Sequence, residues 1–182
     1  MNGKVSNNHG SSEDRQPADA YPRSQELVAN LPYAAMTVLG AAIFVVGFKN
    51  SAWGWAAAGA YLMYGVVGVL WVMVFICPYC WHWNTRTCPC GYGRIAARLR
   101  ERKDPTRFKE KFKKHIPVIV PLWFIPILAG AILAVYNFSW PLLVLLVVFA
   151  LDAFVVLPLF SAKHGCANCP QRDACPWMGH KD

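Results

Sequence analysis

Four long apolar stretches dominate the chain, and polar residues separate them. They run over Leu31–Phe48, Trp53–Ile76, Ile116–Tyr136 and Phe138–Phe160. Each is close to the roughly 20 residues that a helix needs to cross the hydrocarbon core of a bilayer. Four fully apolar helices are too many for the core of one small soluble domain, so the pattern predicts an all-α integral membrane protein with four transmembrane helices in two hairpins.

The same boundaries divide the chain into five segments. We expect a flexible polar tail over 1–30, a first transmembrane hairpin over 31–76, a Cys-rich and basic segment over 77–115, a second hairpin over 116–160 and a Cys-rich tail over 161–182. Composition supports a membrane protein, because 55% of residues are hydrophobic and only 15% are charged, whereas about 25% are charged in soluble domains.

The distribution of lysine and arginine predicts the orientation. Of the 18 such residues, only Lys49 falls in a turn between the two helices of a hairpin, and eleven fall in the segment 77–115. Cytoplasmic loops carry an excess of basic residues. We therefore expect a multi-pass protein of the inner or plasma membrane, with both termini and the middle segment in the cytoplasm.

The middle segment also accounts for the formal net charge of +8. Within it, Ile95 and Leu99 are four residues apart, as are Phe108 and Phe112, which predicts two short helices separated by a break at Asp104-Pro105. Such basic helices can lie on an anionic lipid surface. We expect anionic lipid to be the partner of this segment and do not expect nucleic acid, because no nucleic-acid-binding module is recognisable.

The cysteines are the sharpest chemical signal. All of them follow the second or the fourth apolar stretch, at Cys77, Cys80, Cys88, Cys90, Cys166, Cys169 and Cys175. Each half of the chain thus has a hairpin and a C-x2-C pair, followed by two further cysteines in the first half and one in the second. Two C-x2-C pairs brought together are a common way to build a tetrahedral thiolate site.

Two ways of dividing these ligands are open. Either Cys77, Cys80, Cys166 and Cys169 form one site and Cys88, Cys90 and Cys175 form a second, or each half keeps its own cysteines. The additional ligand would come from His180, His82 or His164. Thiolates suit an iron–sulfur cluster or Zn²⁺, whereas disulfides are rare in a reducing cytoplasm and seven cysteines would leave one thiol over.

Cys77-Pro-Tyr-Cys80 resembles the active-site tetrapeptide of the glutaredoxins, which would imply thiol–disulfide exchange. A redox pair of this kind normally lies at a helix N-terminus, where the helix dipole favours the thiolate. Here the pair follows a helix C-terminus, where the dipole opposes it. We therefore assign no catalytic residue on this resemblance.

A single charged residue, Asp152, interrupts the apolar stretches. An acid within a membrane helix is costly, and such residues often serve as proton relays or ligand contacts. Counting helical rise from the ends of the stretches puts Thr37 and Trp123 at a similar depth, so we expect these three residues to form an intramembrane polar site. A protonated aspartic acid that joins two helices is the structural alternative.

Three functions fit these observations. The first is an iron–sulfur electron-transfer or membrane-anchor subunit of a redox complex, with a quinone or a cytoplasmic redox protein as its partner. The second is a zinc-stabilised scaffold or adaptor, in which the metal holds the helices together. The third is a metal sensor or carrier.

Overall fold

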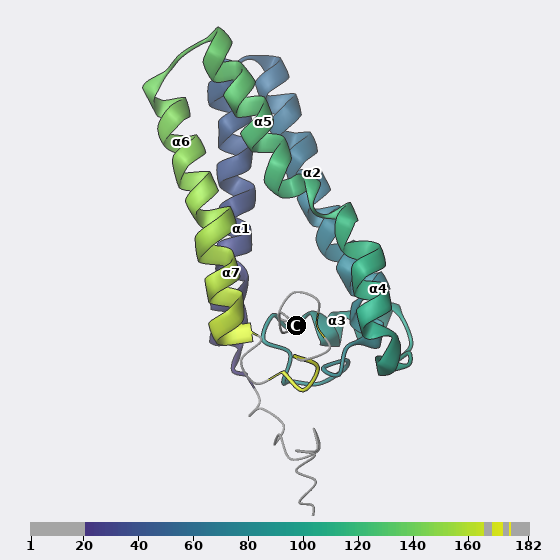
Figure 1. Ribbon diagram of the computed structural model, residues 1–182. Coiled ribbons are helices and arrows are strands. Elements are labelled where there is room, and N and C mark those ends of the chain that lie inside the picture. The colour runs from purple at the N-terminus through teal and green to yellow at the C-terminus, as the bar shows by residue number, and fades with distance from the viewer. Residues whose placement is uncertain (1–20, 166–168, 173–174, 176–182) are drawn as a thin grey trace, which may run out of the picture.

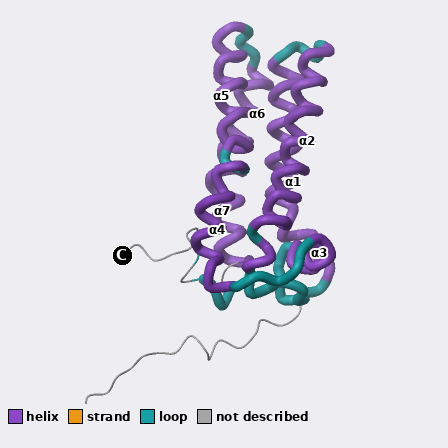
Figure 2. Tube along the Cα trace, turned by 90° about the vertical axis from the view of Figure 1, so that its right-hand side faces the viewer, coloured by secondary structure: helices purple, strands orange, loops and turns teal. Residues whose placement is uncertain are grey.

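A computed structural model describes residues 21–165, 169–172 and 175. In these residues the only regular structure is helical (Figures 1 and 2). Four helical segments are long and apolar enough to span a membrane, at Arg23–Gly47, Ala52–Tyr79, Pro105–Tyr136 and Trp140–His164. The prediction of an all-α chain with four candidate membrane spans is confirmed by length and composition.

The first hairpin consists of α1 (Arg23–Gly47) and α2 (Ala52–Phe75). Lys49 and Asn50 adopt positive φ values of 51° and 56° and reverse the chain between the two helices. The Ser51 hydroxyl then accepts a hydrogen bond from the backbone N–H of Gly54 and so caps α2.

The second hairpin consists of α5 (Pro121–Tyr136) and a long helical arm that begins with α6 (Trp140–Leu151). The arm continues through a π-helical turn at Asp152–Val156, α7 (Leu157–Phe160) and a second π-helical turn at Ser161–Gly165. Ser139 caps α6 by accepting from Leu142 N–H, as Ser51 caps α2.

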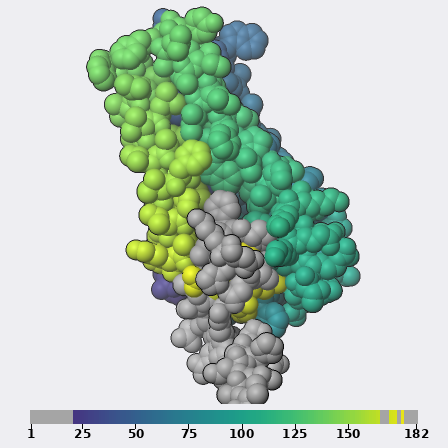
Figure 3. Space-filling model, viewed as in Figure 1, coloured from purple at the N-terminus to yellow at the C-terminus, as the bar shows by residue number. Residues whose placement is uncertain are grey.

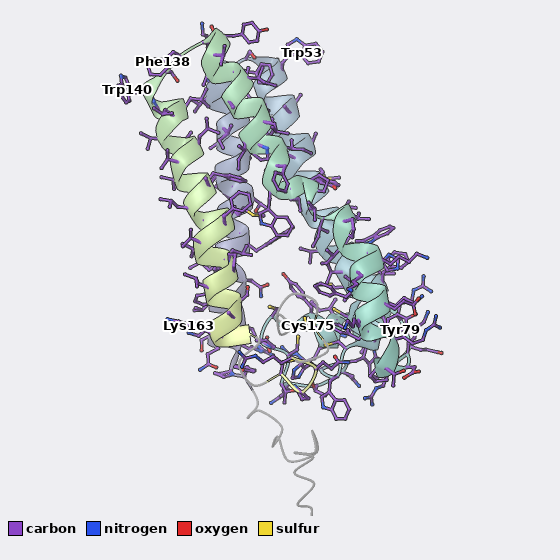
Figure 4. All side chains as sticks on the ribbon, in the orientation of Figure 1. Trp53, Tyr79, Phe138, Trp140, Lys163 and Cys175 are labelled. Carbon is purple, nitrogen blue, oxygen red and sulfur yellow. The ribbon has the colours of Figure 1, made fainter. Side chains whose placement is uncertain are left out.

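The turns of both hairpins lie at one end of the bundle, and the segment that joins the hairpins lies at the other (Figure 1). We call these the turn end and the cysteine end. Trp53, Phe138 and Trp140 all lie at the turn end (Figure 4) and are largely exposed. Aromatic side chains at this level suit the water–membrane interface.

The connecting segment forms short helices at the cysteine end (Figure 2). They are the 3₁₀ turn Cys77–Tyr79, α3 (Tyr92–Leu99), the 3₁₀ turn Pro105–Arg107, α4 (Phe108–His115) and the 3₁₀ turn Ile116–Val118. The two short helices and the break at Asp104-Pro105 are therefore confirmed. At that break the Asp104 carboxyl accepts hydrogen bonds from the Thr106 hydroxyl and the Thr106 N–H, which lower its pKa.

Helix α1 is the centre of the bundle, because it packs against α2, α5 and α6. Gly40 allows a close approach, since a Cβ there would lie 2.4 Å from the ring of Tyr61. The Tyr61 hydroxyl donates to the carbonyl of Leu122 at 2.8 Å. That carbonyl lacks its usual helical donor because residue 126, four positions on, is proline, so a side chain satisfies a backbone group that lipid could not.

Large apolar side chains remain exposed around the outside of the bundle. They include Leu62, Val66, Leu128, Ile132 and Val144, each more than 40% exposed. In the view of Figure 3, the second hairpin covers much of the first, and its outer face is built from α5, α6 and α7. An apolar exterior of this kind fits contact with lipid chains.

The start of the first helix differs most from the sequence-based segments. Helix α1 begins at Arg23, eight residues before the apolar stretch that predicts it, and so takes in the last part of the segment assigned to the polar tail. The extension, residues 23–30, is held by polar contacts at the cysteine end. Hydropathy alone does not register such contacts.

Candidate thiolate site

The described cysteines all lie at the cysteine end, on three separate segments. Cys77 and Cys80 flank the 3₁₀ turn that directly follows α2, and Pro78 between them is fully buried. Cys88 and Cys90 lie in the loop before α3, and Cys169 and Cys175 lie beyond the end of the second hairpin. Figure 4 shows Cys175 between Lys163, at the end of the second hairpin, and Tyr79, just after α2.

The cysteines form two overlapping groups, in each of which the thiols are close enough for a charge on one to affect another. A thiolate at Cys77 lies within electrostatic range of Cys80, Cys88 and Cys90. Cys80 lies within such range of Cys88, Cys169 and Cys175. We call these six residues the cysteine cluster, and Cys80 connects its two halves.

The contacts of Cys80 cross the boundaries of both predicted ways of sharing the cysteines between sites. Cys80 and Cys169, expected in one site, are within range of each other, but Cys80 is also within range of Cys88 and Cys175, which were expected in another. Cys166 and His180 lie outside the described residues. Among the residues that are described, no three of His, Cys, Asp and Glu are arranged so as to hold a metal ion.

Backbone N–H groups point at two of the sulfurs. Gly93 N–H donates to Cys88 Sγ at 3.4 Å, and His82 N–H donates to Cys80. Gly93 is required here, because a Cβ at this position would lie 2.3 Å from the carbonyl oxygen of His82. The chain therefore brings two donors to the thiols through a close backbone crossing at His82 and Gly93.

Burial controls the protonation of this region. It raises the pKa of the Cys80 thiol to about 12, and neighbouring cysteines add to the effect while the N–H of His82 opposes it. A thiol in this state is neutral at pH 7 and is a poor nucleophile.

His82 is the buried histidine of the site. Its Nδ1 lies 2.7 Å from Thr87 Oγ1, which is in turn 2.8 Å from Thr85 Oγ1. Its Nε2 is buried and has no hydrogen-bond partner within the described part of the chain. Burial lowers the pKa of His82, so the imidazole is neutral and keeps a free nitrogen. His164, by contrast, is exposed and stacks on Phe160 with ring centroids 4.3 Å apart.

The extension of α1 contacts the loop that carries Cys88 and Cys90 and the helix that follows it. The sequence did not predict these contacts. Asn30 Nδ2 donates to the carbonyl of Cys90 at 3.1 Å, and Glu26 forms an ion pair with Arg94 of α3. Gly91, with φ of 73°, lets the chain turn into α3 close to Glu26. Glu26 and Asn30 lie too far from Arg94 in the sequence to form a recognisable motif with it.

Gln171 is a second supporting residue that the sequence did not reveal. Its Oε1 accepts from Trp81 N–H at 2.9 Å, and its Nε2 donates to the carbonyls of Tyr79 at 3.3 Å and Pro105 at 3.2 Å. One side chain thus ties the segment that carries Cys169 to the turn that carries Cys80. The two halves of the cysteine cluster are joined through it.

The intramembrane residues occupy a separate place. Asp152 begins a π-helical turn, and its Oδ2 is buried without a hydrogen-bond partner among the described residues. Thr37 donates its hydroxyl within its own helix, to Tyr33 and Ala34 carbonyls at 3.2 and 2.9 Å. Trp123 packs at the edge of the main core. Single π turns inside helices frequently mark functional positions.

Comparisons with known proteins add no further assignment. No family model, curated protein or solved structure matches this chain.

Proposed function

We propose that this chain is an integral membrane protein whose cysteine cluster binds an iron–sulfur cluster, and that it serves as an electron-transfer or membrane-anchor subunit of a redox complex. Both termini and the cysteine end lie in the cytoplasm, as the distribution of lysine and arginine predicts. A quinone in the bilayer or a cytoplasmic redox protein is the partner of the bound cluster.

The observation that carries this proposal is the position of Cys80. It lies within electrostatic range of cysteines from the loop before α3 and from beyond the second hairpin. Thiols from three segments at one end of the bundle offer soft ligands of the kind that iron–sulfur clusters and zinc require. The N–H groups of Gly93 and His82 supply hydrogen bonds to sulfur, which tune the potential of such clusters.

Asp152 adds a proton-handling group to the proposal. It lies within the second hairpin, at a π-helical turn, and one of its carboxyl oxygens is buried and unbonded within the described residues. Quinone reduction requires protons as well as electrons. In this proposal Asp152 accepts and releases a proton, while the cysteine cluster binds the electron carrier.

The test is the composition of the full-length protein purified in detergent under anaerobic conditions. We expect iron and acid-labile sulfide, a brown colour and an electron paramagnetic resonance signal on reduction. Cys80→Ser should lose most of the iron, because it removes the thiol that connects the two groups. Met73→Leu, a volume-conserving change of a buried neighbour of Cys77, should retain it.

Two results would contradict the iron–sulfur proposal. One is a colourless protein that contains zinc, and the other is a Cys80→Ser variant that keeps its iron and its absorption spectrum. Circular dichroism and size-exclusion chromatography show whether each variant is folded, so a loss of iron caused by misfolding is recognised as such.

A zinc-stabilised scaffold is the second candidate, and the contacts of Gln171 favour it. They tie the segment after the second hairpin to the turn after α2, as a structural metal would. In that case removal of zinc by a chelator should lower the melting temperature of the protein, and no redox signal should be present.

A further inference from the structure

A basic cleft lies beside the cysteine cluster, between the extension of α1 and helix α3. It has a volume of about 460 Å³. Its lining includes three arginines, one carboxylate and two large apolar residues: Arg23, Arg94, Arg98, Glu26, Leu27 and Ile95. We call this space the arginine cleft.

The charge of the arginine cleft favours an anion. Its one carboxylate, Glu26, is already paired with Arg94 and its side chain is only 14% exposed. Arg23 and Arg98 have no such partner in the cleft lining, so the lining carries an excess of two positive charges. Guanidinium groups match the oxygens of a phosphate in geometry as well as in charge.

The surroundings of the cleft are apolar, which distinguishes it from a site for a soluble anion. Leu27 is 75% exposed, Leu31 further along α1 is 63% exposed, and Ile95 on α3 is 48% exposed. Helix α1, which supplies part of the cleft lining, is itself a candidate membrane span. A ligand with its phosphate between the arginines could therefore lay an apolar chain along α1.

We propose that the arginine cleft binds the phosphate headgroup of an anionic phospholipid at the cytoplasmic edge of the membrane. The site differs from a general attraction between the basic segment and the lipid surface. It uses two arginines of that segment together with Arg23 from α1, and it leaves out the exposed lysines of α4. The proposal is independent of the metal bound by the cysteine cluster.

Full-length protein in nanodiscs of phosphatidylcholine, with and without an equal part of phosphatidylglycerol, provides the test. Native mass spectrometry then counts the lipid molecules that stay bound when the protein is transferred from the nanodiscs into detergent. The double variant Arg23→Gln/Arg98→Gln should bind phosphatidylglycerol at least about tenfold more weakly, since it removes two guanidinium groups that would form charge-assisted hydrogen bonds with the phosphate. Lys109→Gln/Lys113→Gln removes the same charge outside the cleft and should bind as the wild type does.

Three outcomes would overturn the proposal. Equal weakening in both double variants would mean a diffuse surface attraction. Full displacement of the bound lipid by millimolar inorganic phosphate would mean a site for a free anion. Wild-type retention of phosphatidylglycerol by the cleft variant would mean no site at all. Metal content is measured on the same samples and should not change, so a failure here is distinct from a failure of the iron–sulfur proposal.

Discussion

The two ends of the bundle are stabilised in different ways. At the turn end, Ser51 and Ser139 each accept a hydrogen bond from a backbone N–H three residues further along the chain. At the cysteine end, the side chains of Asn30, Glu26 and Gln171 form contacts with residues 60 to 92 positions away. The first kind of contact forms within one hairpin, whereas the contacts of Gln171 also require the second hairpin to be in place.

This difference has a consequence for folding and for ligand binding. Contacts between distant segments cost more chain entropy to form than local ones. The cysteine end is therefore complete only when the segment after the second hairpin is in place, and a metal bound by the cysteine cluster would stabilise that complete state. Changes at the cysteine end should affect metal binding, and changes at the turn end should not.

The largest effect on stability is expected for Gly93→Ala. A Cβ at this position would lie 2.3 Å from a backbone oxygen of His82, which cannot rotate away. Overpacking of this kind costs about 1–3 kcal/mol or more. The backbone must separate there, so the N–H bond to Cys88 should break and the thiol should react faster with a maleimide. Thermal unfolding in detergent micelles measures the loss of stability.

Gly59→Ala is the matched control for that variant. It makes the same change inside α2, where a Cβ would meet nothing within 4 Å. Alanine favours a helix over glycine by about 0.5–1 kcal/mol, so this variant should be as stable as the wild type or slightly more stable. Equal destabilisation by both variants would show that the crossing at His82 is not tight.

A smaller effect is expected for Gln171→Ala. It removes three hydrogen bonds to backbone groups, each worth about 0.5–1.5 kcal/mol net, although water can replace some of them. The segment that carries Cys169 should then separate more readily from the turn that carries Cys80. Iron content after dilution and the rate of proteolysis near residue 171 both report this. Gln171→Glu keeps the acceptor for Trp81 and should lose less, and an unchanged proteolysis rate in Gln171→Ala would contradict the anchoring role.

Most of the bundle could be predicted from the sequence because its signals are local. The apolar stretches predict the four spans, and the spacing of Ile95 with Leu99 and of Phe108 with Phe112 predicts the short helices. The extension of α1 could not be predicted in this way, because its residues are polar and its helix is held by Asn30 and Glu26 acting on a distant loop. The π-helical turn at Asp152 lies in a run that otherwise reads as uniform helix.

The cysteines show the same division between local and distant information. The location of the described cysteines at one end follows from their positions after the second and fourth apolar stretches. The overlap of the two groups at Cys80 depends on how the hairpins pack and on the Gln171 contacts, which no spacing encodes. Spacing identifies candidate ligands, and tertiary packing decides which of them meet.

The smallest effect is expected at the turn end, for Ser51→Ala. Loss of this cap leaves the Gly54 N–H without its acceptor, at a cost of about 1 kcal/mol. The positive φ values of Lys49 and Asn50 already fix the reversal of the chain, so the hairpin should still form. Iron content and phosphatidylglycerol binding should equal those of the wild type, while the melting temperature falls by a few degrees. If iron content fell together with the melting temperature, the two ends would be coupled through α1 and α2, and the cysteine end could not be treated as a separate unit.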